Sequence, residues 1–131
     1  MTSVLLSLAT IVALGACAPA SAGVRTIVLD IEHSRFRPAH LTVTRGETVR
    51  FVVRNGDPID HELIVGDREV QDIHENGTEA HHGAKPGEVS VPADGEASTT
   101  YTFDSSEDLL FGCHLPAHWD YGMKGSITVE G

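Results

Sequence analysis

Three side chains that bind soft metal ions lie close together near the C-terminal end of the sequence. Cys113, His118 and Met123 follow one another in the pattern Cys-x4-His-x4-Met. A thiolate, an imidazole and a thioether suit copper, because the sulfur ligands favour the reduced ion and imidazole binds both oxidation states. His61, which opens a predicted strand after a turn over residues 55–60, is the best candidate for a second imidazole. These four residues predict one copper ion per chain in a trigonal site with a distant methionine, a geometry used for one-electron transfer.

Short strands separated by turn residues must hold these ligands in place. Alternating and β-branched segments predict about eight strands, at 26–31, 41–44, 48–53, 61–65, 89–91, 98–103, 109–113 and 126–129. No segment has a convincing long helical pattern, so the predicted fold class is all-β, an antiparallel sandwich or barrel. The exception is the polar segment 69–86, which lacks alternation and is expected to be a long loop or a short irregular helix.

Glycines in the ligand segment are expected to shape its path. Gly112, directly before Cys113, should leave room beside the metal and allow an unusual backbone angle. Gly122 should permit the turn that returns Met123 to the metal. Pro116 should stiffen the segment.

The ligand segment, with its upstream histidine and closing strand, resembles the copper loop of the cupredoxins, the group that includes plastocyanin, azurin and pseudoazurin. Its spacing is closest to the rusticyanin and auracyanin pattern. Residues 36–38, 41–43, 46–49 and 60–65 resemble the first half of the same family. The resemblance covers roughly residues 26–130 and implies a Greek-key β-sandwich.

By this resemblance, His61, Cys113 and His118 would be the equatorial copper ligands and Met123 the axial one. Many family members place Asn or Ser directly after the first histidine, where it tethers the second ligand loop. Glu62 stands at that position here. We expect its negative charge to favour oxidised copper and so to lower the reduction potential.

Further histidines raise the question of a second site. His74, His81 and His82 lie in the polar segment and could form a weak second site that helps to capture copper or zinc, or they could belong to a solvated loop. His114 follows Cys113, as in the His-Cys-His motif of multicopper oxidases, but residue 112 is glycine here. We therefore expect His114 to be a partly exposed side chain.

The first 22 residues resemble an export signal, because they are uncharged and carry an apolar run too short to span a bilayer. Cys17 ends a sequence similar to a bacterial lipobox and could be lipidated, whereas residues 20–22 fit ordinary cleavage before residue 23. An N-terminal strand or helix of the fold is the remaining alternative. The predicted organisation is a signal peptide at 1–22 and one domain at 23–131, located in the periplasm or at the extracytoplasmic face of the envelope.

The charge and the site together predict a role. A net charge of -10 argues against binding to nucleic acid or anionic lipid and favours a basic protein partner. We expect a monomeric one-electron carrier that docks with redox partner proteins. Residues 115–117 and Trp119 around His118 are expected to pack the ligand loop, to form the apolar patch for electron transfer that the family resemblance implies, or to do both. The alternative is a copper-binding protein for storage, delivery or resistance. An enzyme is not expected, because oxidases and nitrite reductases of this kind need a second copper centre.

Overall fold

The computed structural model describes residues 23–78, 81–83 and 85–131. Within these ranges the chain forms nine strands and one helix. The elements in chain order are β1 (Arg25–Ile31), β2 (Phe36–Arg37), β3 (His40–Thr44), β4 (Thr48–Asn55), β5 (His61–Gly66), α1 (Arg68–Glu75), β6 (Glu88–Val91), β7 (Glu96–Thr102), β8 (Leu109–Gly112) and β9 (Lys124–Glu130). The signal peptide and the lipidation site predicted at Cys17 lie outside the described residues.

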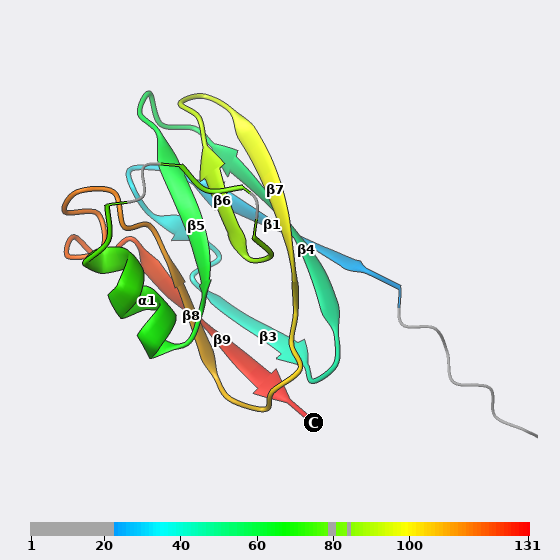
Figure 1. Cartoon of the computed structure of the whole chain (residues 1–131). Helices are drawn as coiled ribbons and strands as arrows, with labels where there is room; N and C mark the ends of the chain where they lie inside the picture. Colours follow the sequence, from blue (N-terminus) through cyan, green and yellow to red (C-terminus); the bar gives the residue numbers. More distant parts are fainter. Residues whose placement is uncertain (1–22, 79–80, 84) are drawn as a thin grey trace, which may run out of the picture.

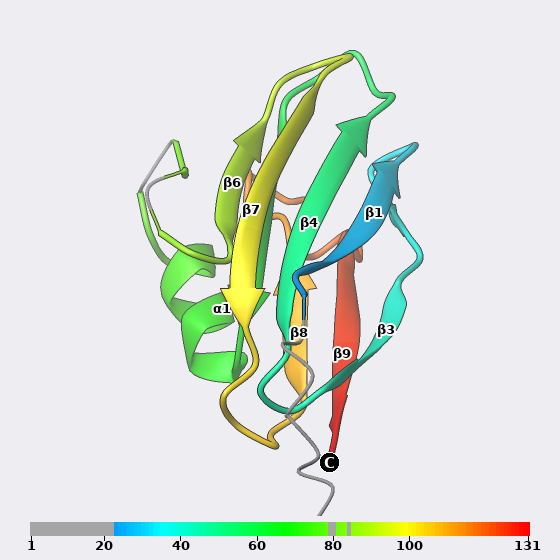
Figure 2. The same ribbon diagram turned by 90° about the vertical axis from the view of Figure 1, so that its right-hand side faces the viewer.

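The strands form two sheets that pack face to face, as Figures 1 and 2 show from two directions. The first sheet has the order β2-β1-β4-β7, and the second has the order β3-β9-β8-β5-β6. The predicted all-β class and two-sheet sandwich are therefore confirmed. Each predicted strand begins within two residues of an observed one.

Two pairings depart from the predicted antiparallel arrangement. β1 runs parallel to β4, and β3 runs parallel to β9. Parallel neighbours need a long connection between them. After β1 the chain adds β2 to the same sheet, forms β3 in the second sheet and then returns as β4. This excursion lets β4 run beside β1 in the same direction.

Apolar side chains from both sheets meet in one core. Phe36 of the first sheet and Phe111 of the second pack edge to face, with ring centroids 5.3 Å apart. β5 is buried at all six positions. The core covers one of its faces, while α1 lies against β5 and β8 on the other side (Figure 1). The first candidate ligand, His61, therefore begins a strand that is fixed on both faces.

The helix α1 forms the first part of the polar segment 69–86, for which the sequence predicted either a long loop or a short irregular helix. The Asp67 side chain caps its N-terminus by accepting a hydrogen bond from the N–H of Val70 at 2.9 Å. Gly66 lets the helix approach β5, because a Cβ there would lie 2.6 Å from the Val70 side chain. No helix among the described residues is long and apolar enough to cross a membrane.

Candidate metal centre

His61, Cys113 and His118 converge between the start of β5 and the connection from β8 to β9. Nδ1 of His118 lies 3.3 Å from Nδ1 of His61 and 3.2 Å from Sγ of Cys113. The three donor atoms all lie within 4.8 Å of one another. Because His61 and Cys113 are buried and His118 is partly exposed, the group has one edge toward solvent. The structure thus brings together three of the four predicted ligands, which are two imidazoles and a thiol.

Asp57 fixes the orientation of the His61 ring, a role that the sequence pattern did not indicate. Its carboxylate faces Nε2 of His61 at 2.9 Å and accepts two backbone N–H bonds, from His33 and Ser34, at 2.7 Å each. Burial acts to raise the pKa of Asp57, but these hydrogen bonds outweigh it and lower the pKa below its ordinary value. The ionised carboxylate holds the proton on Nε2 and so directs the lone pair of Nδ1 toward Cys113 and His118.

Burial also sets the protonation of the other two candidate ligands in this group. It raises the pKa of the Cys113 thiol to about 12, and the carboxylates of Glu62 and Glu75 act in the same direction. The metal-free sulfur therefore carries its proton at neutral pH, and a bound cation must displace it. The pKa of His118 is lowered, first by burial and then by the neighbouring His61, so its ring is available as a neutral ligand.

Met123 lies in the core and is tied to the other two candidate ligands of its loop through the backbone. Its side chain is fully buried. Its N–H donates to the carbonyl of His118 at 3.0 Å, and its carbonyl accepts from the N–H of Cys113 at 3.1 Å. Gly122 adopts φ +88°, a left-handed conformation that suits glycine, and so makes the predicted turn. A thiol, two imidazoles and the thioether of a residue whose backbone bonds to two of these ligands form a donor set that fits copper.

Gly112 has a different role from the predicted one. A Cβ at this position would clash with the ring of Trp119, so glycine makes room for the tryptophan. Trp119 is buried, and it stacks on His114 with ring centroids 4.6 Å apart. The ammonium of Lys124 lies 4.6 Å from the centroid of the Trp119 ring. Trp119 therefore packs the ligand loop against the sheet.

Glu62 tethers the ligand loop although it is not Asn or Ser. Its Oε1 accepts a hydrogen bond from the backbone N–H of His114, next to Cys113, at 2.7 Å. Its Oε2 lies 3.3 Å from Nε2 of His82. The carboxylate is almost fully buried and joins the ligand loop to the histidines of the polar segment.

The expectation of a partly exposed His114 side chain was wrong. Its ring is only 2% exposed, because it is stacked on Trp119 and bonded at both nitrogens. Nδ1 lies 2.7 Å from Glu75, and Nε2 lies 2.8 Å from Oε1 of Gln71. The sequence could not reveal these contacts, since both partners lie on a helix that it predicted only as an alternative.

The structure brings together two of the three histidines of the polar segment and separates the third. His74 and His82 form a second group of potential ligands with Glu88, in which the donor atoms lie within 4.8 Å of one another. His81 is exposed and lines a different pocket, beside His61. Glu88 had not been singled out, because a glutamate at the start of a short strand gives no signal of its own.

Comparisons with known proteins agree with this geometry. A family model described as copper binding proteins of the plastocyanin/azurin family matches residues 25–130. The copper-resistant cuproprotein CopI of Rubrivivax gelatinosus is 36% identical over 119 residues, which cover 88% of this chain and 71% of that protein. The protein of the same name from Pseudomonas aeruginosa is 28% identical over 150 residues, covering 90% and 83%.

The fold is also found among solved structures. Dithionite-reduced auracyanin from Roseiflexus castenholzii matches with a TM-score of 0.68 and 22% identity, over 83% of this chain and 100% of that one. Fold and donor set define a copper-binding protein of the cupredoxin type, as the ligand segment had predicted. The chain belongs to the plastocyanin/azurin family of copper-binding proteins. Copper is therefore its metal.

Proposed function

We propose that the chain is an exported copper-handling protein that serves copper resistance by storing or delivering the ion. One copper ion is held by four side chains, His61, Cys113, His118 and Met123. The convergence of a buried thiol with two imidazoles carries this proposal. Two relatives named as copper-resistant cuproproteins favour copper handling over electron transfer.

The residues around the site have distinct parts in this function. Asp57 presents the Nδ1 atom of His61, and the hydrogen bonds between Cys113, His118 and Met123 hold the ligand loop closed. Because the Cys113 thiol, whose pKa is about 12, is protonated before binding, uptake of copper releases a proton and becomes more favourable as the pH rises. None of these steps makes or breaks a bond in a substrate, so we propose that the protein is not an enzyme.

Electron transfer is the second candidate function, supported by the surroundings of His118. This candidate ligand is partly exposed, and Pro116 and Ala117 beside it are exposed. An electron could pass through the His118 edge to a docked protein. The net charge of -10 would favour a basic partner, and binding by a monomer would be transient. For both candidate functions we propose that the protein works on the extracytoplasmic side of the membrane, in agreement with the export signal predicted for residues 1–22.

Visible absorption and electron paramagnetic resonance spectra of the copper-loaded protein test the metal centre. We expect an intense thiolate-to-copper band that the Cys113→Ser variant lacks, because serine cannot supply the sulfur ligand. His40→Ala, which removes an exposed histidine on β3 that is outside the ligand set, is the control and should keep the band. Only weak copper absorption in the unaltered protein would contradict the proposed ligand set.

Two further measurements separate the candidate functions. A copper-handling protein should restore the copper tolerance of a bacterial strain that lacks its own homologue, and Cys113→Ser should not. The copper ion should also pass to a competing chelator or to an apo-protein. An ion that resists exchange, together with unchanged tolerance, would instead support the electron carrier.

A further inference from the structure

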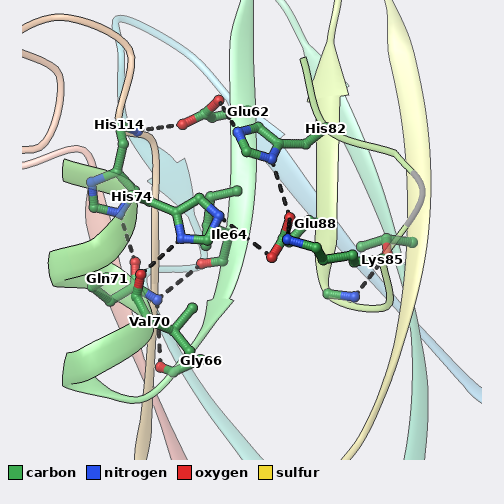
Figure 3. Close-up of polar contacts among 12 residues, drawn as sticks. Glu62, Ile64, Gly66, Val70, Gln71, His74, His82, Lys85, Glu88 and His114 are labelled. Carbon is green, nitrogen blue, oxygen red and sulfur yellow. Dashed lines mark hydrogen bonds and ion pairs between the residues drawn. The ribbon is translucent and has the colours of Figure 1, made fainter. Parts of the chain in front are cut away.

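A second group of potential metal ligands lies beside α1. His74 projects from α1, Glu88 begins β6, and His82 lies in the segment between them. Figure 3 shows these three side chains turned toward one another, with Glu62 of β5 above His82. The side chains of His74 and Glu88 are 10% and 11% exposed. Those of His82 and Glu62 are 2% and 3% exposed. So many nearly buried polar groups need strong partners.

The distances match those between ligands that share one small cation. Oε2 of Glu88 lies 3.1 Å from Nδ1 of His82, and Oε1 of the same carboxylate lies 3.4 Å from Nε2 of His74. In a tetrahedral zinc site with bonds of about 2.0–2.1 Å, neighbouring ligand atoms are about 3.3 Å apart. Each imidazole therefore lies at about this distance from one oxygen of the Glu88 carboxylate, and the three donor atoms all lie within 4.8 Å of one another.

Hydrogen bonds outside the group already orient its ligands. Nδ1 of His74 lies 2.8 Å from the carbonyl of Val70, which can only accept, so Nδ1 carries a proton and Nε2, which faces Glu88, is the nitrogen left to bind a metal. The other nitrogen of His82, Nε2, faces Oε2 of Glu62 at 3.3 Å. A histidine ligand whose second nitrogen is bonded to a carbonyl or a carboxylate is the common arrangement in metal sites.

A cation can reach the group from solvent. A surface pocket of about 280 Å³ is lined by Glu62, His74, His82 and Lys85, among others. The Lys85 ammonium lies 3.8 Å from Glu88, but its side chain is 65% exposed and can turn away into water. The pocket therefore gives a route of entry past one exposed lysine.

We propose that His74, His82 and Glu88 bind one divalent cation of the zinc and copper(II) class, with Glu62 as a positioning residue. Two imidazoles and a carboxylate without sulfur favour these ions over copper(I), which prefers thiolate and thioether ligands. At a given site of this kind copper(II) binds more tightly than zinc. The site is separate from the copper centre and joins it through Glu62, whose other oxygen holds the loop next to Cys113.

Calorimetric titration of the copper-loaded protein with zinc tests this proposal. A single equivalent of copper first fills the centre at Cys113 and leaves the second site open, so that added zinc reports the second site. We expect one equivalent of zinc to bind while the thiolate-to-copper band stays constant. His82→Ala and Glu88→Gln should each weaken zinc binding by at least tenfold. His81→Ala is the matched control, because this exposed histidine is adjacent in sequence but outside the group, and it should leave zinc binding unchanged.

Several results would overturn the proposal. One is zinc binding of equal affinity in the unaltered protein and in Glu88→Gln. Another is a loss of zinc affinity in His81→Ala as large as that in His82→Ala. The third is zinc uptake that displaces copper and so removes the thiolate-to-copper band. Circular dichroism and the copper band of each variant verify that it is folded, and His74→Ala replaces any variant that is not. This titration does not measure copper tolerance, so the absence of a zinc site would not contradict the proposed copper-handling function. Likewise, a failed copper-tolerance test would not contradict the zinc site.

Discussion

Glu62 contacts both groups of candidate metal ligands with its two carboxylate oxygens. One oxygen accepts the backbone N–H of His114 beside Cys113, and the other faces His82. The hydrogen bond to the His114 N–H could be accepted by the oxygen of any side chain of suitable length. The negative charge is therefore the property that distinguishes glutamate here from the Asn or Ser of related proteins.

This charge should lower the reduction potential of the copper centre. Glu62→Gln keeps an oxygen for the His114 N–H but removes the charge, so we expect the potential to rise. The rise should be on the order of 100 mV or less, the size expected for one charge several ångströms away at an effective dielectric constant of about 20. Redox titration of the copper band measures it.

Glu69→Gln on the exposed surface of α1 removes the same charge away from the ligand loop and is the control. It should shift the potential far less, because water screens an exposed charge. An unchanged or lower potential in Glu62→Gln would contradict this account.

Sequence alone could predict single residues where their types and spacing are unusual. The cysteine, histidine and methionine of the ligand segment are rare residues at fixed intervals, and the structure brings Cys113 and His118 together with His61. Asp57 and Glu88 could not be found in this way, because acidic residues are frequent in this chain and their partners lie on other elements. The two neighbouring histidines at 81–82 show a further limit, since only the backbone path decides which one turns inward.

At the scale of the elements, α1 is held on the sheet by an amide rather than by an apolar stripe. Gln71 is fully buried, and its NH2 group lies 3.3–3.4 Å from the carbonyls of Ile64, Gly66 and Leu110. Its oxygen faces His114. Because the amide group bonds to both β5 and β8, it fixes the position of α1 on the sheet. This position brings His74 and Glu75, in the last turn of the helix, into contact with Glu88 and His114.

Replacing this amide should weaken the fold. In Gln71→Leu the side chain keeps a similar size but removes the donor that faces the buried carbonyls, and we expect the free energy of unfolding to fall by about 2 kcal/mol. Urea unfolding followed by circular dichroism measures the change. Glu69→Ala, exposed on the same helix, should change stability by less than about 0.5 kcal/mol. Equal stability of Gln71→Leu and the unaltered protein would show that the amide bonds do not hold the helix.

The same helix explains why this part of the fold was harder to predict than the strands. β3 and β9 carry the apolar alternation typical of half-buried strands, and their positions could be predicted from it. The inner face of α1 is formed instead by Gln71 and His74, beside Val70, which packs on Gly66. Polar residues that are buried through hydrogen bonds give no hydrophobic period, so the helix could be inferred only as one of two alternatives.

Over the whole molecule, burial together with acidic charge makes the fold sensitive to alkaline pH through Tyr101. Its ring, on β7, packs against Phe103 with centroids 5.0 Å apart and against Gly87, where a Cβ would lie 2.7 Å from it. Burial raises the pKa of Tyr101, and the carboxylates of Asp67 and Asp104 add to the effect. The folded protein therefore favours the neutral phenol more strongly than the unfolded chain does.

The stability that this preference contributes is complete below the ordinary tyrosine pKa of about 10 and is lost as the pH rises through the higher folded value. We expect the free energy of unfolding to fall between about pH 9 and pH 11 less steeply in Tyr101→Phe than in the unaltered protein. Urea unfolding at each pH measures it. Subtracting the two proteins removes the contribution of other groups, including Cys113, and identical slopes would contradict the assignment.

The connection between β8 and β9 holds three of the four candidate copper ligands, and backbone hydrogen bonds close it on itself. His61 belongs instead to the sheet. In evolutionary terms, the connection is a module: insertions, deletions and exchanges there can alter the chemistry of the metal centre, while the two sheets that carry stability stay intact. A lineage can thus turn one scaffold toward holding, releasing or reducing a metal ion by changing a single connecting segment.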